Sequence, residues 1–260
     1  MAIITFTSDF GTRDHYVAAV KAKIFNYNPN IQVIDITHHI DTFNIAHGAF
    51  VLSSVFRDFP KGTVHLISVN SLSSPEHKFV AVKMEEHYFV GTDNGLFSLL
   101  SDKSPVIVEL PIDKNNPLTF PEKNIFAFAA VSLASGKNIY DLGVSSPNFT
   151  LNKLINRKLK SNKNSIEGNI IHIDAYGNAI TNISQKLFEE IGKGRQYTIG
   201  FGREEFFKIN TTYYEVDLAD CTFVFNDLRL LEIAINNGKA SNLLGLHYDK
   251  PIKIDFTPEE

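Results

Sequence analysis

The sequence predicts an α/β protein with two domains, and three observations lead to that prediction. In the first half of the chain, short runs of apolar and β-branched residues alternate with stretches of helical spacing. These runs are apolar throughout, which is typical of parallel strands whose sheet is covered by helices on both faces. In the second half, short strands recur between turns, which is typical of a small β domain.

We therefore expect an N-terminal three-layer α/β/α domain with a mostly parallel sheet at residues 1–152, and a C-terminal small β-barrel domain at residues 168–260. The stretch between them, residues 153–167, is rich in lysine and asparagine and is interpreted as a solvated linker. No internal repeat or low-complexity tract interrupts this organisation.

The composition excludes several classes of function. The 260 residues are 43% hydrophobic and carry a net charge of −4, which gives no general attraction for nucleic acid or an anionic membrane. The single cysteine, Cys221, allows no internal disulfide, and the histidines lack the spacing of metal ligands, so we expect no metal. No apolar run reaches the ~20 residues that span a membrane, and no leader is recognised. We expect a cytoplasmic protein.

The first element is a strand that ends in an acid. The apolar run that begins at Ile3 is followed by Asp9 and Gly11, and helical spacing begins at Tyr16. Ligands of open α/β sheets bind beyond the carboxyl ends of the strands, and a carboxylate accepts two hydrogen bonds from a vicinal diol such as a ribose. Asp9 is therefore a candidate binding residue. The alternative is that Asp9 and Asp14 only cap the following helix.

The next elements repeat the alternation of strand and helix. The strand at 31–36 ends near His38 and His39, for which we favour a structural role over ligand orientation. After a third strand ending at Asn70, the pattern indicates an antiparallel hairpin. The remaining expectations for the first half are a helix at 45–56, strands at 64–70, 79–83, 88–91 and 106–110, a loop at 115–117 and a helix at 124–135.

The second half contains four expected strands and one or two short helices. Residues 231–238 form either a strand with a turn or a single helical turn. The expected strands cover residues 168–173, 196–200, 222–225 and 252–256, and a helix is expected at 186–192.

Six short motifs recur in a specific order over nearly the whole chain. They lie at residues 7–17, 33–38, 59–65, 93–96, 174–183 and 232–234, and include Thr-Ser-Asp-Phe-Gly and Asp-Ala-Tyr-Gly-Asn-Ala-Ile-Thr-Asn. In this order they resemble the S-adenosylmethionine hydroxide adenosyltransferases. These are adenosine-forming S-adenosylmethionine hydrolases related to fluorinase and chlorinase.

The resemblance implies a homotrimer whose adenosyl sites lie between the N-terminal domain of one subunit and the C-terminal domain of its neighbour. It implies that Asp9 holds the ribose hydroxyls and Asp174 the methionine ammonium, and that Asn178 reads the adenine edge with Tyr176 near the ring. These residue types suit those groups, since carboxylates attract cations, an amide pairs with a purine edge and an aromatic ring stacks. The alternative for residues 174–178 is a tight turn with Gly177 at positive φ.

The sequence departs from the family at its catalytic positions. The family uses an aspartate, an arginine and a histidine to direct a water at the ribose C5′ and displace methionine, and here these positions hold Asn70, His77 and Pro121. General acid-base assistance is worth about 10²–10⁴-fold, so hydrolysis is expected to be strongly impaired. It need not be abolished, because positioning alone contributes several kcal/mol.

A replacement for the lost groups is present in the sequence. Glu122 is next to the lost histidine position, so Glu122 and His77 are a candidate pair for water activation. The alternative is that Glu122 is a solvated loop acid or a helix cap. A halogenase is disfavoured, because fluorinase has other residues at Asn70 and Ser73 and a serine where Glu122 stands, and a carboxylate repels a halide. Ser73 and Asp14 remain candidate substrate-binding residues.

A further departure concerns the methionine tail. Asn226 and Asp227 are candidate substrate-binding residues, but the family usually has serine at the second position. An acid there would repel the methionine carboxylate, which leaves open adenosine or an adenosyl compound without that carboxylate as the ligand.

Three functions remain open, none of which needs a cofactor. The first is hydrolysis of S-adenosylmethionine to adenosine and methionine. The second is adenosyl binding without turnover, as a sensor or sink, and the third is a structural oligomer. Retention of Asp9, Asp174 and Asn178 argues against the third, and loss of the catalytic residues favours the second over the first.

Overall fold

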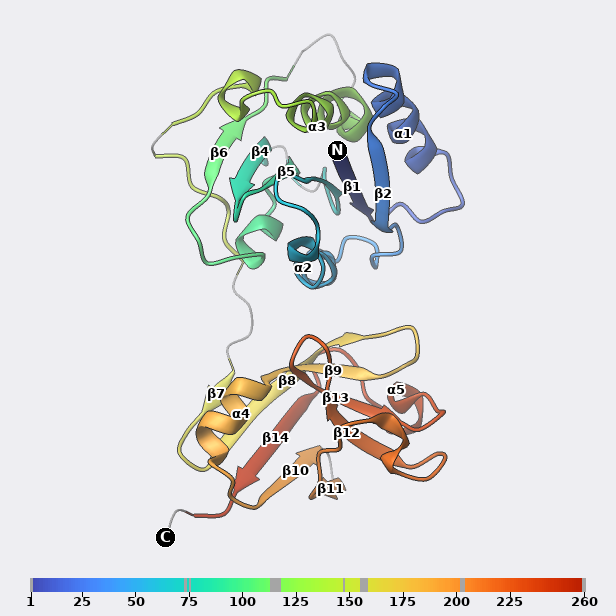
Figure 1. The fold of residues 1–260 in the computed structure, drawn as a ribbon, viewed down its shortest axis with the longest axis vertical. Coiled ribbons are helices and arrows are strands. Elements are labelled where there is room, and N and C mark those ends of the chain that lie inside the picture. Colours follow the sequence, from blue (N-terminus) through green and yellow to red (C-terminus); the bar gives the residue numbers. More distant parts are fainter. Residues whose placement is uncertain are drawn as a thin grey trace. The chain divides into compact units, whose positions relative to one another are not determined.

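A computed structural model describes residues 2–72, 74, 76–112, 118–146, 148–154, 159–201 and 204–258. The chain divides into two compact units, Met1–Ile155 and Asn156–Glu260, and each is described by itself (Figure 1). The expected loop at 115–117 and the candidate Ser73 lie outside the described residues. Among the residues described, no helix has the length and apolarity needed to cross a membrane.

The first unit is built on a six-stranded sheet of order β2-β1-β3-β5-β4-β6. β1 pairs in parallel with β2 and β3, and β3 with β5, whereas β4 is antiparallel to both β5 and β6. The strands are β1 (Ile3–Ser8), β2 (Gln32–Thr37), β3 (Val64–Ser68), β4 (Phe79–Met84), β5 (His87–Thr92) and β6 (Val106–Glu109).

The expected mostly parallel sheet is therefore mixed, and the expected hairpin explains why. Glu85 and Glu86 both have positive φ, at 51° and 66°, and form a two-residue turn between β4 and β5. Such a turn has the twist of an antiparallel hairpin and leaves no room for a parallel crossover. β6 then adds to the free edge of β4 in the same antiparallel sense.

Helices cover both faces of this sheet (Figure 1). On one face, Val20 and Leu133 pack with Ile4 and Leu66 of the sheet; on the other, Leu52 packs in a separate core cluster. The sheet residues are apolar on both sides because both sides are covered. The helical elements are α1 (Tyr16–Tyr27), α2 (Ile45–Ser53), η1 (Phe56–Asp58), η2 (Leu96–Leu99), η3 (Glu122–Phe126), α3 (Ala127–Ala134) and η4 (Ile139–Leu142).

The second unit is an antiparallel sheet that curls into a half-barrel. Its strand order is β11-β10-β14-β8-β9-β13-β12, with β7 also paired to β8, and a bridge between Asn210 and Val224 links the chain after β11 to β12. The strands are β7 (Lys160–Ser161), β8 (Ser165–Ile173), β9 (Ala179–Ser184), β10 (Tyr197–Phe201), β11 (Glu204–Phe206), β12 (Cys221–Phe225), β13 (Leu230–Ile235) and β14 (Pro251–Phe256).

Three helical segments complete this unit, namely α4 (Gln185–Gly192), η5 (Tyr213–Glu215) and α5 (Ala240–Leu243). The stretch 230–235 is a strand, which decides between the two alternatives left open above. β8 begins at Ser165, inside the stretch expected to be a linker, because its first residues pair with β14 on one side and with β7 on the other, where Lys160 lies opposite Glu167. Opposite charges that face each other across paired strands stabilise the pairing of β7 with β8. The composition of this stretch, taken alone, is that of a solvated linker.

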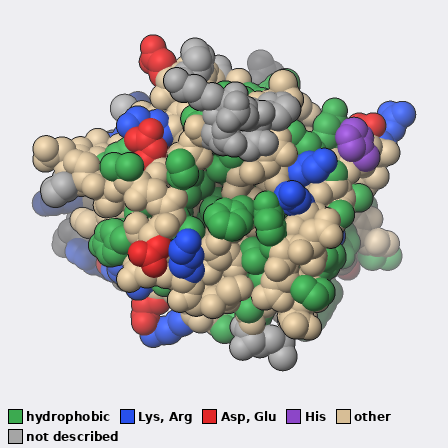
Figure 2. All heavy atoms as spheres, turned by 90° about the horizontal axis from the view of Figure 1, so that it is seen from above, with side chains coloured by type: hydrophobic (Ala, Val, Ile, Leu, Met, Phe, Trp, Pro, Cys, Tyr) green, Lys and Arg blue, Asp and Glu red, His purple; other side chains and the backbone are tan. Residues whose placement is uncertain are grey.

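The surface carries charges of both signs. In the face drawn in Figure 2, acidic and basic side chains are interspersed among apolar and neutral groups, and several of them lie side by side. This distribution agrees with the small net charge of −4.

Candidate functional site

Asp9 follows the last residue of β1, at the carboxyl end of the strand. Its Oδ2 accepts hydrogen bonds from the backbone N–H groups of Phe43 (3.0 Å) and Asn70 (3.1 Å). The helix-capping alternative is wrong, because the N-cap of α1 is His15, no side chain caps that helix, and Asp14 is exposed in the preceding bend. A carboxylate held through one oxygen keeps acceptor capacity on the other, which suits a hydroxyl ligand.

Glu122 is buried, which corrects the expectation of a solvated loop acid. It is the first residue of η3, a π-helical turn, and its side chain is 2% exposed. Its Oε1 accepts a hydrogen bond from Ser68 Oγ at 2.6 Å, and Ser71 is a second partner. Burial raises the pKa of the Glu122 carboxyl, the two serine hydroxyls oppose that rise, and the negative charge of Asp9 adds to it.

Asn70 is held by its backbone at the end of β3. Its φ of 51° turns the chain so that its N–H points to Asp9, and its carbonyl accepts from Asn94 Nδ2 at 3.2 Å. The structure thus brings Asn70 to Asp9, and Asp9 close enough to Glu122 to influence its titration.

His77 lies within electrostatic range of Asp93. It is half-buried before β4, and its positive charge lowers the pKa of the Asp93 carboxyl, which burial otherwise raises. Glu122 accepts hydrogen bonds from Ser68 and Ser71, and Asp9 acts on it through its charge, so a Glu122–His77 pair stays a prediction.

A buried histidine supports the end of β1. His38 is 5% exposed, its Nδ1 lies 2.7 Å from Ser8 Oγ, and its Nε2 lies 3.1 Å from Asp35 Oδ1. Burial lowers the pKa of His38, and Asp35 opposes that effect. These contacts favour a structural role for His38, because they fix the residue that precedes Asp9. His39, by contrast, is exposed.

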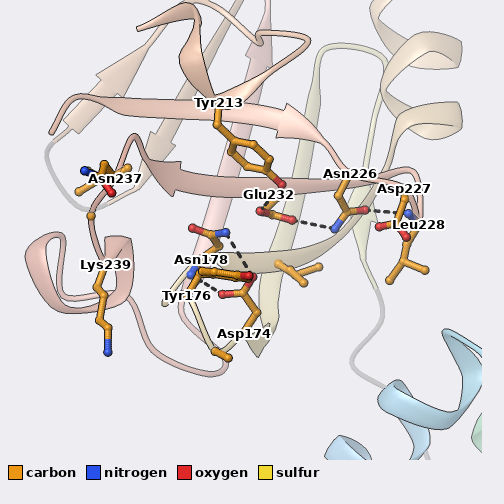
Figure 3. A pocket seen from close by; sticks show the side chains of 14 residues that line it. Asp174, Tyr176, Asn178, Tyr213, Asn226, Asp227, Leu228, Glu232, Asn237 and Lys239 are labelled. Carbon is orange, nitrogen blue, oxygen red and sulfur yellow. Dashed lines mark hydrogen bonds between the residues drawn. The ribbon is translucent and has the colours of Figure 1, made fainter. Parts of the chain in front are cut away.

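The second unit contains a cavity of about 770 Å³ (Figure 3). Five of the residues that line it are candidates predicted from the sequence, and they come from the turn between β8 and β9 and from the turn between β12 and β13. The five are Asp174, Tyr176, Asn178, Asn226 and Asp227.

The β8–β9 turn is both a tight turn and a wall of the cavity. Asp174 Oδ1 accepts from the N–H of Asn178 at 2.8 Å, and Oδ2 accepts from Asn178 Nδ2 at 3.2 Å. Gly177 has a φ of +85°, and a Cβ there would lie 2.8 Å from Lys239 Cβ, so glycine is required. The turn alternative is therefore confirmed as geometry, and it does not exclude ligand binding by the same side chains.

Two residues of this cavity were missed. Glu232 of β13 is 3% exposed and accepts hydrogen bonds from Tyr213 Oη (2.9 Å) and Asn226 Nδ2 (3.0 Å). Burial raises the pKa of Glu232, and the charges of Asp174 and Asp227 raise it further. Burial raises the pKa of the Tyr213 phenol well above its usual range, and the hydrogen bond to Glu232 and the charge of Glu232 raise it further.

The sequence contained a signal for only one of them. Glu232 is an acid in an otherwise apolar strand, and buried acids are rare without partners. Tyr213 belongs to η5, which is separate in sequence from the two turns that supply the predicted residues. No pattern in the sequence around Tyr213 marks it as a site residue.

The two groups of residues have different chemistry. The first presents hydroxyl and carboxylate groups at strand ends, whereas the second presents carboxylates, amides and the exposed rings of Tyr176 and Tyr213. In the part of the chain that the structure describes, no cluster of three or more histidine, cysteine, aspartate or glutamate residues is arranged to hold a metal ion. Taken by itself, the first group suits a ligand with hydroxyl groups, and the second suits a ligand with a cationic group and amide-pairing groups.

Comparison with known proteins gives matches in both units. Residues 4–143 match the SAM hydroxide adenosyltransferase N-terminal domain, and residues 168–253 match the C-terminal domain, SAM being S-adenosylmethionine. An (R)-S-adenosyl-L-methionine hydrolase of Methanocaldococcus jannaschii is 31% identical, over 98% of this chain and 96% of the relative. A fluorinase of Actinoplanes sp. is 22% identical over 75% of this chain and 76% of its own.

A solved structure is similar over the same extent. An uncharacterized conserved protein from Thermotoga maritima superposes with a TM-score of 0.88 at 30% identity, covering 97% of this chain and 99% of that one. Because the two domain matches together span most of the chain, the resemblance found in the short motifs is confirmed. The chain belongs to the SAM hydroxide adenosyltransferase family.

Proposed function

We propose that the protein binds adenosyl compounds and hydrolyses S-adenosylmethionine slowly to adenosine and methionine, with Glu122 in place of the lost water-activating groups. The observation that carries this proposal is the buried Glu122 carboxyl, which accepts a hydrogen bond from Ser68 at the end of β3 and is within electrostatic range of Asp9. Relatives named as (R)-S-adenosyl-L-methionine hydrolases support the reaction type.

Binding is proposed to use both groups of residues. Asp9 would accept hydrogen bonds from the ribose hydroxyls, Asp174 would attract the cationic end of the ligand, and Asn178 would pair with the adenine edge near Tyr176. Asp9 is held by two backbone N–H groups and Asp174 by Asn178, which supports their being oriented before a ligand arrives.

In the proposed reaction, the oxygen of a water attacks the ribose C5′ while the bond from C5′ to sulfur breaks. The bonding electron pair goes to sulfur, so methionine leaves as a neutral thioether. The proton released by the water passes to Glu122, whose raised pKa makes it a stronger base than an ordinary glutamate. Water is the only co-reactant, so no cofactor is needed.

Loss of the family groups at Asn70 and Pro121 favours a second candidate, an adenosyl-binding protein without turnover that acts as a sensor or sink. Prolonged incubation with S-adenosylmethionine, followed by chromatography for adenosine and methionine, separates the two. We expect slow product formation that Glu122→Gln reduces by about 10²-fold or more. Glu76→Gln, at an exposed acid of the loop before β4, is the matched control and should leave turnover unchanged.

Adenosine binding without any product from the unmodified protein would favour the second candidate. Unchanged turnover in Glu122→Gln would remove Glu122 from the mechanism.

We also propose that the protein is a homotrimer whose ligand sites are completed by neighbouring copies, as the family resemblance implies. Sedimentation at several concentrations tests the assembly. A variant that is monomeric, folded and still binds adenosine with unchanged affinity would contradict shared sites.

A further inference from the structure

The cavity of the second unit carries more negative charge than the tail of S-adenosylmethionine balances. Its described lining includes the carboxyl groups of Asp174, Asp227 and Glu232 (Figure 3). The charges of Asp174 and Asp227 both raise the pKa of Glu232 and of Tyr213, so their electrostatic effects overlap inside one cavity. A ligand that enters therefore meets a cluster of acids rather than a single one.

The methionine tail is poorly matched to such a cluster. Its ammonium and carboxylate are borne by the same carbon, and each bond to that carbon is about 1.5 Å long. A tail that places its ammonium beside Asp174 therefore brings its carboxylate within a few ångströms of the same acids. Like charges at that separation are repulsive and lower affinity.

The cations near the cavity are poorly placed to relieve the repulsion. Among the described residues of the lining, Lys239 is the one cation; it is exposed, and in Figure 3 its side chain extends away from the carboxylates. The guanidinium closest along the chain to Asp227, that of Arg229, donates to Gln185 Oε1 at 3.3 Å. The amides of Asn178 and Asn226 already donate to Asp174 and Glu232.

We propose that Asp227 makes this cavity select adenosyl sulfonium compounds whose side arm ends in an amine and carries no carboxylate. The inference rests on the proposed adenosyl-binding function and names the ligand class for the same site. At neutral pH such a compound carries two positive charges, on sulfur and on the amine, whereas S-adenosylmethionine carries a net charge of one. Both compounds have positive charges on sulfur and nitrogen, and they differ in the carboxylate of S-adenosylmethionine, which the extra acid would repel.

The test is calorimetric titration of the full-length protein with adenosine, S-adenosylmethionine and decarboxylated S-adenosylmethionine, under identical salt. We expect the decarboxylated compound to bind about tenfold more tightly than S-adenosylmethionine, as expected for one unfavourable charge contact. Asp227→Ser should reduce that ratio to near one, mainly by tightening the binding of S-adenosylmethionine.

A charge-matched control separates a local effect from the overall field. Asp255→Asn removes an acid of the same unit that pairs with Lys253 on the exposed side of β14 and does not line the cavity. It should leave the ratio unchanged. Thermal unfolding of each variant verifies that it is folded.

The outcomes distinguish the two proposals. Adenosine binding together with equal affinity for the two sulfonium compounds would overturn the inference and leave the proposed function standing. A tenfold preference that survives in Asp227→Ser would overturn the role given to Asp227. Failure of adenosine itself to bind would overturn the proposed function and the inference with it.

Discussion

The two acidic groups of the molecule are held in different ways. In the first unit, Asp9 and Glu122 accept hydrogen bonds from backbone N–H groups and serine hydroxyls at the ends of strands. In the second unit, Asp174 and Glu232 are held by amide and phenol groups at the edge of a cavity, with a third, exposed acid beside them. We therefore expect the first group to orient the ligand and the reacting water, and the second group to select ligands by their charge.

The largest expected effect tests the positional role. Asp9→Ala should weaken adenosine binding by about 100-fold or more, because two hydrogen bonds to a charged group are worth about 1.5–3 kcal/mol each. The change also leaves the N–H groups of Phe43 and Asn70 without their acceptor. Calorimetry measures the loss, with Asp102→Ala, at an exposed acid of the same unit, as control, and similar affinity in both variants would contradict the assignment.

The next effect concerns the hydrogen bonds of the second group. Tyr213→Phe removes one donor to the buried Glu232 and should lower the free energy of unfolding by about 1–3 kcal/mol. Tyr214→Phe, at a tyrosine that is 79% exposed, is the matched control and should be neutral. Denaturant unfolding measures both, and equal stabilities would mean that the phenol of Tyr213 does not support Glu232.

A smaller effect follows from the raised pKa of Glu122. The folded protein holds this proton at pH values where the unfolded chain, with its ordinary value of 4.5, has released it. The contribution of Glu122 to stability is therefore lost as pH rises from about 4.5 through the raised pKa. Glu122→Gln should unfold at a temperature a few degrees higher than the unmodified protein at pH 8, about 1 kcal/mol corresponding to 2–4 °C.

That difference should shrink toward pH 5, and thermal melts at the two pH values measure it. The opposite trend would be a stability of Glu122→Gln, measured against the unmodified protein, that is lower at pH 8 than at pH 5. It would show that the buried charged form of Glu122 does not destabilise the fold. Together with lost turnover, greater stability would be the signature of a residue kept for function.

The smallest expected effect is the difference in stability between two glycine substitutions, one in each unit. Gly11 and Gly177 both have positive φ, but a Cβ at Gly11 meets open space, whereas one at Gly177 meets Lys239. Gly11→Ala should cost about 1 kcal/mol for the strained backbone alone, and Gly177→Ala more, because Lys239 must also shift. Equal costs in denaturant unfolding would mean that Lys239 moves freely.

The sequence predicted what depends on periodicity and strand ends. Asp9 could be placed because an apolar run followed by helical spacing marks the carboxyl end of a strand. The turn at Asp174 to Asn178 could be predicted because glycine, asparagine and aspartate have turn preferences. The five candidate residues of the second unit, which the family resemblance indicated, lie together in one cavity.

What could not be predicted depends on local geometry and on distant contacts. The burial of Glu122 follows from a π-helical turn and from Ser68, 54 residues away, and neither has a spacing signature. The early start of β8 depends on pairing with β14, more than 80 residues away, and with β7, whereas the composition of this stretch alone resembles a solvated linker. Tyr213 reaches Glu232 from a different element, so only the fold brings them together.

The most direct test of the account is calorimetric titration of the unmodified protein with adenosine. Adenosine contains the ribose and purine that Asp9 and Asn178 are proposed to recognise, and it lacks the charged tail on which the ligand classes differ. Binding at one site per chain that is lost in both Asp9→Ala and Asn178→Ala is the predicted result. Absence of binding heat at two temperatures, with no rise in the thermal unfolding temperature at millimolar adenosine, would contradict the central claim.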